Sequence, residues 1–210
     1  MKHELFKRVF SSAILIPIAL FVVIKGSYIF NLFLIICFLI ATYEWFKMSL
    51  KNTYKYFGFI FLIFSFYTVY KLRLDEYVLL SLVVLICVLT DIGGYIFGNI
   101  FKGPKLTKFS PNKTYSGMCG SYLLSFIITI VFFNDYFFND IQLLKMFIYI
   151  FLISTVSQVG DIVISYFKRI SKIKDTGKII PGHGGLLDRI DGMIFAFPFF
   201  YIINLIDKIL

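Results

Sequence analysis

The chain has 210 residues, of which 59% are hydrophobic, and its mean hydropathy is +0.85. Soluble domains are about 45–50% apolar, so this composition excludes an ordinary soluble protein and indicates an integral membrane protein. The formal net charge of +9 comes from 21 Lys and Arg against 12 Asp and Glu. Because this charge is spread over several loops and no nucleic-acid-binding module is visible, we expect no nucleic acid among the partners.

The apolar segments predict an all-α integral membrane protein, a polytopic bundle of about seven transmembrane helices with cytoplasmic catalytic loops. We expect residues 1–210 to form a single catalytic domain. The expected spans, in chain order, are Val9–Ile24, Ser27–Phe46, Tyr56–Tyr70, Tyr77–Ile100, Met118–Phe133, Leu143–Ile164 and Met193–Leu205. The third is short against the roughly 20 residues that a span needs, so we expect it either to extend into its flanks or to lie partly in the interface.

The basic residues predict the orientation of this bundle. With the N-terminus in the cytoplasm, 16 of the 21 Lys and Arg fall in inside segments and 5 in outside segments. Such a bias over short loops is the usual signal for the cytoplasmic side. The polar loops after the fourth and sixth spans would therefore face the cytoplasm, where nucleotides are found.

The fourth expected span carries a carboxylate, Asp91, with Tyr95 one turn away. An acid at the bilayer centre costs about 2.5–3.5 kcal/mol on insertion scales, so its presence needs a reason. Two interpretations stay open, a buried polar packing contact and a residue that lines a functional site. Gly94 and Gly98 share a face of the same helix and predict close approach by a neighbouring helix.

Two further carboxylates lie near the cytoplasmic ends of spans. Glu44 adjoins Trp45, and we interpret it as an interfacial residue. Asp161 has Ser157 and Ser165 one turn before and after it, on the same face. A polar stripe on an apolar helix indicates the bundle interior or a water-filled cleft, which here would lead into the loop that follows.

The loop after the fourth span combines four lysines with two prolines and several glycines. Ser110, Lys113 and Thr114 lie in its run S-P-N-K-T. Backbone N–H groups and lysine favour anions, so this loop is a candidate phosphate-binding segment. The tendency of basic residues to gather in cytoplasmic loops would also account for its lysines.

The segment from Ser165 to Asp191 is the long polar stretch of the chain, with six basic residues and three carboxylates. Asp188 and Asp191 are three apart and would share a helix face if the last helix began there. Mg²⁺ binds one or two carboxylates together with phosphate oxygens, and Asp161 could complete such a set.

Basic and glycine residues in this segment suit the same chemistry. Lys168, Arg169 and Lys174 would neutralise phosphate charge, and Gly184 and Gly185 would allow a ligand to approach the backbone. His183 has several interpretations, a general acid, a phosphate hydrogen-bond donor or a structural histidine. The residues together predict metal-dependent phosphate chemistry at the cytoplasmic face of a membrane.

This segment resembles the signature of the phosphatidate cytidylyltransferases, S-x-x-K-R-x4-K-D-x-G-x2-I-P-x-H-G-G-x-x-D-R-x-D, at each fixed position from Ser165 to Asp191. The earlier pattern of that family, an Asp in a helix followed by Tyr, Gly and S-P-x-K-T, is similar to the run from Asp91 to Thr114. An E-W pair like Glu44-Trp45 also occurs in the family. The resemblance thus covers about residue 44 to the C-terminus.

The resemblance implies transfer of the cytidylyl group of CTP to phosphatidic acid, which gives CDP-diacylglycerol and pyrophosphate. It implies Mg²⁺, alone or with a second cation, held by Asp161, Asp188 and Asp191. The expected catalytic residues are Asp161, Asp188, Asp191, Lys168, Arg169, Lys174 and His183. The expected substrate-binding residues are Asp91, Tyr95, Ser110, Lys113, Thr114, Asp175, Gly184, Gly185 and Arg189.

The same resemblance implies a multi-pass protein of the bacterial inner membrane with its active site facing the cytoplasm. A homodimer is compatible with so small a bundle. Two rival functions stay open, a CTP-dependent lipid kinase and a transporter of an anionic substrate. The transporter predicts paired repeats and broken helices, which the sequence does not show.

Overall fold

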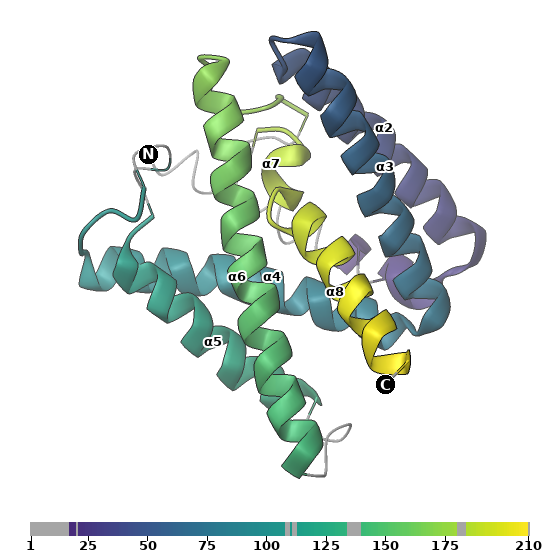
Figure 1. Ribbon diagram of the computed structural model, residues 1–210, viewed down its shortest axis with the longest axis vertical. Helices are drawn as coiled ribbons and strands as arrows, with labels where there is room; N and C mark the ends of the chain where they lie inside the picture. Colours follow the sequence, from purple (N-terminus) through teal and green to yellow (C-terminus); the bar gives the residue numbers. More distant parts are fainter. Residues whose placement is uncertain are drawn as a thin grey trace. The chain divides into compact units, whose positions relative to one another are not determined.

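The computed structural model describes residues 17–19, 21–107, 110, 113–133, 140–179 and 184–209. The regular secondary structure of these residues is helical, with no strand among them, although an antiparallel bridge pairs Lys105 with Thr114. The helices that carry labels in Figure 1 are α2 (Ser27–Met48), α3 (Asn52–Asp75), α4 (Tyr77–Phe101), α5 (Tyr115–Phe133), α6 (Asp140–Ile170), α7 (Leu187–Ile190) and α8 (Met193–Ile209). The predicted all-α class is confirmed.

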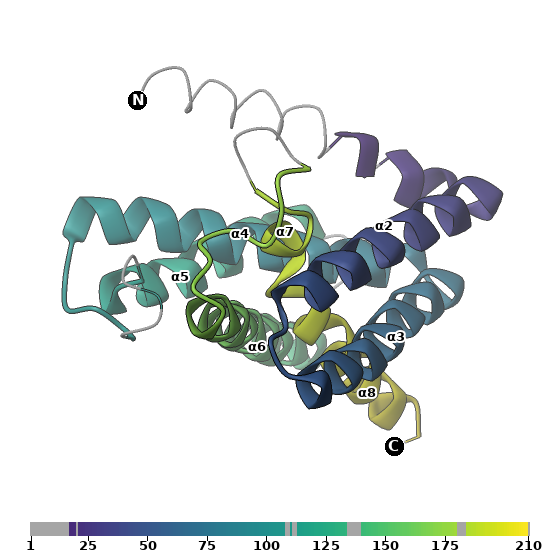
Figure 2. The same cartoon turned by 90° about the horizontal axis from the view of Figure 1, so that it is seen from above.

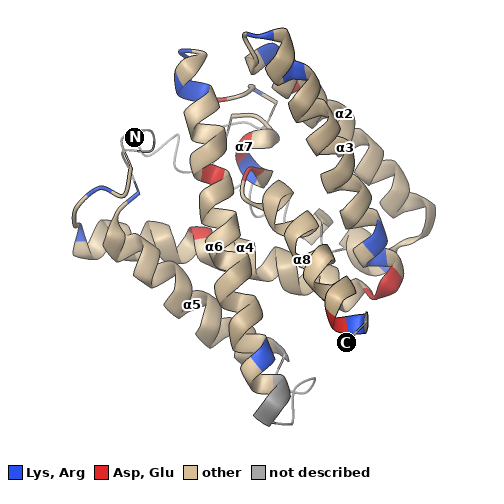
Figure 3. Ribbon diagram, viewed as in Figure 1, with Lys and Arg blue, Asp and Glu red and all other residues tan. Residues whose placement is uncertain are grey.

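Five of these helices, α2 to α6, are long and apolar enough to cross a membrane. Figure 3 shows them free of charged residues along most of their length. The third expected span extends into both flanks, as one of the two alternatives predicted, and forms the 24-residue helix α3. Helix α8 has 17 residues, and most of the first expected span, Val9–Ile24, lies outside the described residues. The chain is therefore a helical multi-pass membrane protein, and a total of seven spans stays a prediction.

The chain divides into two compact units. Unit 1 comprises Met1–Ser81 and Phe167–Asp191, and unit 2 comprises Leu82–Tyr166 and Gly192–Leu210. Unit 1 therefore contains α2, α3, α7 and the last turn of α6, whereas unit 2 contains most of α4 and α6 together with α5 and α8.

In unit 1 the helices α2 and α3 lie side by side, as Figures 1 and 2 show from two directions. The indole N–H of Trp45, near the end of α2, donates to the backbone oxygens of Tyr54 and Lys55 in α3 at 3.1 and 3.2 Å. Gly58 lies directly against the same indole ring, where a Cβ atom would overlap it. The absence of a side chain at Gly58 thus lets the two helices meet closely around Trp45.

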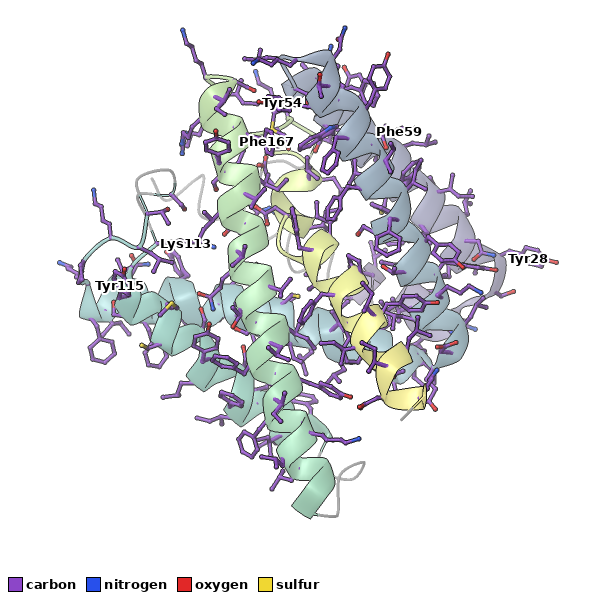
Figure 4. The ribbon with its side chains drawn as sticks, in the orientation of Figure 1. Tyr28, Tyr54, Phe59, Lys113, Tyr115 and Phe167 are labelled. Carbon is purple, nitrogen blue, oxygen red and sulfur yellow. The ribbon has the colours of Figure 1, made fainter. Side chains whose placement is uncertain are left out.

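The last turn of α6 is fixed to this helix pair by aromatic contacts. The ring of Phe167 packs edge-on against Trp45 and against Tyr54, with centroids 5.1 and 5.6 Å apart, and Figure 4 labels two of the three rings. Edge-to-face pairs of this kind add about 0.5–1.5 kcal/mol beyond the area they bury. The polar segment that follows α6 therefore starts from a fixed point in unit 1.

In unit 2 the helices α4 and α5 approach through glycines. A Cβ on Gly93 would lie 2.6 Å from the backbone oxygen of Gly120, and one on Gly117 would lie 2.7 Å from that of Gly94. Gly98 also faces Gly117, with a distance of 3.7 Å from its would-be Cβ to the Gly117 Cα. The close approach predicted from Gly94 and Gly98 is confirmed, with α5 as the neighbour.

Buried hydroxyl groups join three helices of unit 2. Thr90 of α4 donates to Ser154 of α6 at 2.8 Å and pairs with Ser125 of α5 at 3.1 Å. Ser121 of α5 donates to the backbone oxygen of Thr90 at 2.6 Å. Lipid offers no hydrogen bonds, so hydroxyl groups within a span are satisfied by partners on other helices.

Candidate active site

The polar segment of unit 1 ends in a single turn of helix, α7 (Leu187–Ile190), that contains Asp188. Asp191 and Gly192 then form a turn, and α8 begins at Met193, where the last helix was expected. Asp188 and Asp191 are therefore not both in the last helix, and the condition under which they would share its face is not met. Glycine is a poor helix former, which favours a break at this position.

Glu44, near the C-terminal end of α2, contacts the start of α7, and its exposure is 0%. One carboxylate oxygen accepts the backbone N–H of Leu186 at 3.1 Å, and the other accepts that of Leu187 at 2.8 Å. The second oxygen also accepts the hydroxyl of Thr176 at 3.0 Å. The carboxylate thus binds the otherwise unpaired N–H groups at the start of α7, where negative charge is favourable.

Asp188 is the second buried carboxylate of the region, with a side chain that is 4% exposed. Its Oδ1 accepts from the ammonium of Lys168 at 2.9 Å. Its Oδ2 accepts the backbone N–H groups of Thr176 at 2.8 Å and of Gly185 at 3.0 Å. Thr176 therefore contacts both carboxylates, Glu44 through its hydroxyl group and Asp188 through its backbone.

The glycines of the segment make room for these carboxylates. A Cβ on Gly185 would lie 2.5 Å from Oε1 of Glu44 and would also overlap the Thr176 hydroxyl. Gly184 has φ +93°, a conformation that side chains rarely adopt, and its Cβ would lie 2.7 Å from Oδ2 of Asp188. The structure gives both glycines a role in packing, and their predicted contact with a ligand stays a prediction.

The remaining predicted residues of unit 1 differ in exposure. Asp191 is buried, with 7% exposure. Four of the predicted charged residues are exposed, namely Arg169, Lys174, Asp175 and Arg189. His183 lies outside the described residues.

Unit 2 brings together two other predicted residues, Lys113 and Asp161. The ammonium of Lys113 forms an ion pair with Oδ2 of Asp161 and lies 3.4 Å from the backbone oxygen of Gln158. Ser165 donates to Oδ1 of Asp161 at 3.3 Å, so the polar stripe on α6 is partly confirmed. Figure 4 labels Lys113 in the connection between α4 and α5. This ion pair joins the S-P-N-K-T loop to α6.

The other predicted residues of that loop contribute to its shape. The Thr114 hydroxyl accepts the backbone N–H of Gly117 at 3.1 Å, which is the usual N-cap contact of a helix that begins at Tyr115. The backbone oxygen of Ser110 accepts the N–H of Lys113 at 3.1 Å, directly before the cap.

Asp91 and Tyr95 both lie on an exposed face of α4, and Tyr95 is 70% exposed. An exposed Asp91 is not a buried packing contact, so that interpretation of Asp91 is wrong. A role for Asp91 in lining a functional site stays a prediction.

Two residues of the site were not predicted, Glu44 and Thr176. Glu44 was interpreted as an interfacial residue, whereas the structure buries it completely. The signal that could have found it is its place in an apolar helix, because an acid there needs a partner. Thr176 carries no such signal, since a threonine in a polar loop is ordinary.

The carboxylates fit a hard cation by ligand type, because Mg²⁺ prefers oxygen ligands. Asp161 forms an ion pair with Lys113, and Asp188 forms one with Lys168, so each carboxylate already has a positively charged partner. Within the described ranges, no group of three or more His, Cys, Asp or Glu side chains lies close enough to hold a metal ion.

Comparisons with known proteins place these residues in a family. A family model described as "Cytidylyltransferase family" matches residues 6–79 and 56–206. A protein named phosphatidate cytidylyltransferase from Rickettsia typhi is 32% identical over 213 residues, which cover 97% of this chain and 93% of the relative. One of the same name from Staphylococcus haemolyticus is 46% identical over 113 residues, covering 52% of this chain and 42% of the relative. The chain therefore belongs to the cytidylyltransferase family.

Proposed function

We propose that this chain transfers the cytidylyl group of CTP to phosphatidic acid and releases pyrophosphate, as the name of its relatives indicates for them. The observation that carries the proposal is the Lys168–Asp188 pair, which is fixed inside the signature segment by backbone N–H groups and lies on a unit with exposed basic residues. A lysine held in this way is suited to binding phosphate oxygens.

The reaction needs little acid–base help from the protein. A phosphate monoester has a second pKa of about 6, so the lipid phosphate is already an anionic nucleophile near neutral pH. One of its oxygens forms a bond to the α-phosphorus of CTP, and the bond from that phosphorus to the β-phosphate oxygen breaks. The leaving group is pyrophosphate, which carries away the electron pair.

The main difficulty is therefore the repulsion between two polyanions. Lysine and arginine side chains reduce it and stabilise the charge that develops on the transferred phosphate and the leaving group. We assign this role to Lys168, Arg169, Lys174 and Arg189 of the signature segment, and to Lys113 of the other loop.

The metal assignment extends the same argument. The candidate metal ligands are Asp188 and Asp191 in unit 1 and Asp161 in unit 2. Mg²⁺ bound by such carboxylates would supply further positive charge beside the phosphates. The lysine that pairs with each of Asp161 and Asp188 would then be available to phosphate oxygens.

We further propose that the site faces the cytoplasm of a bacterial inner membrane, where CTP is available. The bias of basic residues toward one set of loops supports this orientation. In unit 1 the C-terminal end of α2 contacts the signature segment, as expected if both lie on the same side of the membrane.

Product identification tests the proposed function. Purified protein in detergent is incubated with phosphatidic acid, Mg²⁺ and CTP labelled either in the cytosine or in the γ-phosphate. Cytosine label in the lipid and γ-label in pyrophosphate are the expected results. Transfer of the γ-label alone to lipid would instead identify a CTP-dependent lipid kinase, and no labelled lipid from folded protein would favour a transporter.

A further inference from the structure

Glu44 lies outside the signature segment, yet it accepts three hydrogen bonds from that segment, donated by Thr176, Leu186 and Leu187. We propose that Glu44, acting through Thr176, is a positioning residue that holds the signature segment so that Asp188 and Lys168 face the substrates correctly. This inference rests on the proposed cytidylyl transfer.

Burial is the first reason to assign a specific role to Glu44. Removing a carboxylate from water is costly unless hydrogen bonds replace the water, and an apolar residue at the same place would avoid that cost. At 0% exposure, Glu44 is stabilised by two backbone N–H groups and one hydroxyl. The end of a helix such as α2 does not require a buried acid. The burial of Glu44 is therefore best explained by the hydrogen bonds that it accepts from the signature segment.

The second reason is that Thr176 connects Glu44 to Asp188. The Thr176 hydroxyl donates to Glu44 at 3.0 Å, and its backbone N–H donates to Oδ2 of Asp188 at 2.8 Å. The other oxygen of Asp188 is 2.9 Å from the Lys168 ammonium. A shift of Glu44 would therefore move Thr176 and, through it, disturb the Asp188–Lys168 pair.

The third reason is the close packing around the carboxylate. A Cβ on Gly177 or on Gly185 would overlap the Glu44 carboxylate. The absence of a side chain at these two positions of the signature segment therefore leaves room for Glu44. The Ser171 hydroxyl also donates to the backbone oxygen of Met48 at 2.5 Å, which fixes the start of the segment to the end of α2. The described part of the segment is therefore joined to the end of α2 at Ser171, at Thr176 and at the start of α7.

The test uses Glu44→Gln, Thr176→Val and the double variant. The amide of Gln offers one acceptor where Glu44 uses two, and its NH₂ group would face a donor. Thr176→Val removes the hydroxyl but keeps the backbone N–H that binds Asp188. Thr68→Val is the matched control, because Thr68 is an equally buried threonine of unit 1 whose hydroxyl bonds within α3, to the backbone oxygen of Ser65.

Turnover is measured per folded molecule, with kcat and KM determined separately for CTP and phosphatidic acid. We expect Glu44→Gln to lower kcat by about 10- to 100-fold with smaller changes in KM, since small misplacements of reacting groups cost up to about 10²-fold. Thr176→Val should lower kcat in the same direction. The kcat of the double variant should be no lower than that of Glu44→Gln alone, because both substitutions disrupt the same Thr176–Glu44 hydrogen bond. Thr68→Val should keep the wild-type kcat.

Hydrogen exchange provides a readout that does not depend on activity. The amides of Leu186 and Leu187 should exchange faster in Glu44→Gln, because they lose their acceptors. Faster exchange with wild-type kcat per folded molecule would show that Glu44 only stabilises the fold and would overturn the proposal.

If Glu44→Gln does not fold, Thr176→Val decides, and wild-type kcat in that variant also overturns the proposal. Failure of the proposed function is a separate result, since it would appear as the absence of labelled lipid with the wild-type protein.

Discussion

Replacement of Asp188 by Asn separates the structural role of this carboxylate from its catalytic role. The Asn carbonyl oxygen can take the place of Oδ2 and accept the N–H groups of Thr176 and Gly185. The NH₂ group then faces the Lys168 ammonium, so a donor meets a donor. Asp188→Asn should therefore keep the α7 turn while Lys168 loses its partner.

The magnitude follows from burial. Removing one member of a buried ion pair costs about 3–5 kcal/mol, because the other charge stays buried without a partner. The side chain of Lys168 is 12% exposed, and that of Asp188 is 4% exposed. Because Lys168 keeps some contact with water, we expect a loss near the lower end, about 3 kcal/mol of unfolding free energy.

The assay combines thermal unfolding in detergent with cytidylyl transfer. Asp188→Asn should lower Tm and reduce kcat by at least about 100-fold, because it removes a proposed metal ligand and the partner of Lys168, and loss of a cation that stabilises the developing negative charge has about that cost. Adding Lys168→Gln supplies an acceptor to the Asn amide and should restore much of the lost stability but no activity. Asp188→Asn with turnover within a few fold of wild type would refute both the metal assignment and the role of the Lys168–Asp188 pair.

Four further predictions test the rest of the structure. Gly185→Ala should lower both stability, by about 1–3 kcal/mol, and kcat, because the new methyl group overlaps the Glu44 carboxylate. Gly93→Ala should cost about 1–3 kcal/mol in thermal unfolding, since a backbone oxygen of α5 lies 2.6 Å from the added Cβ, whereas Gly103→Ala, with its nearest atom at 3.3 Å, should cost much less. Thr90→Val should cost about 1 kcal/mol in the same measurement with little change in kcat, because it removes a hydroxyl that joins three helices in the membrane. Chelation of divalent cations should abolish labelled lipid and added Mg²⁺ should restore it, and activity that persists after chelation would contradict the metal assignment.

Much of the fold was readable from the sequence. The spans from α2 to α6 are continuous apolar runs, and burial in lipid is decided locally by such runs. The paired glycines of α4 predicted a close helix contact, since small side chains are what such a contact needs. The sequence did not identify α5 as the partner helix, because spacing along one helix does not reveal which neighbour it faces.

The ion pairs of the candidate site illustrate the same limit. Lys113 and Asp161 were each predicted to act on phosphate or metal, and the structure pairs them with one another. Lys168 and Asp188 were likewise predicted separately and are found together. Residue type and spacing indicate which chemistry a segment can perform, whereas the partner of each charge depends on how distant segments fold together.

The sequence by itself determined the class, the family and the candidate chemistry, because composition, apolar runs and the fixed spacing of the signature are properties of the linear chain. Only the tertiary structure decided the burial of Glu44 and the partners of its carboxylate. Its hydrogen-bond partners lie 132 to 143 residues away along the chain. The reason is physical: a buried carboxylate must find donors wherever folding brings them, and here folding brings the start of α7 and Thr176 against the end of α2.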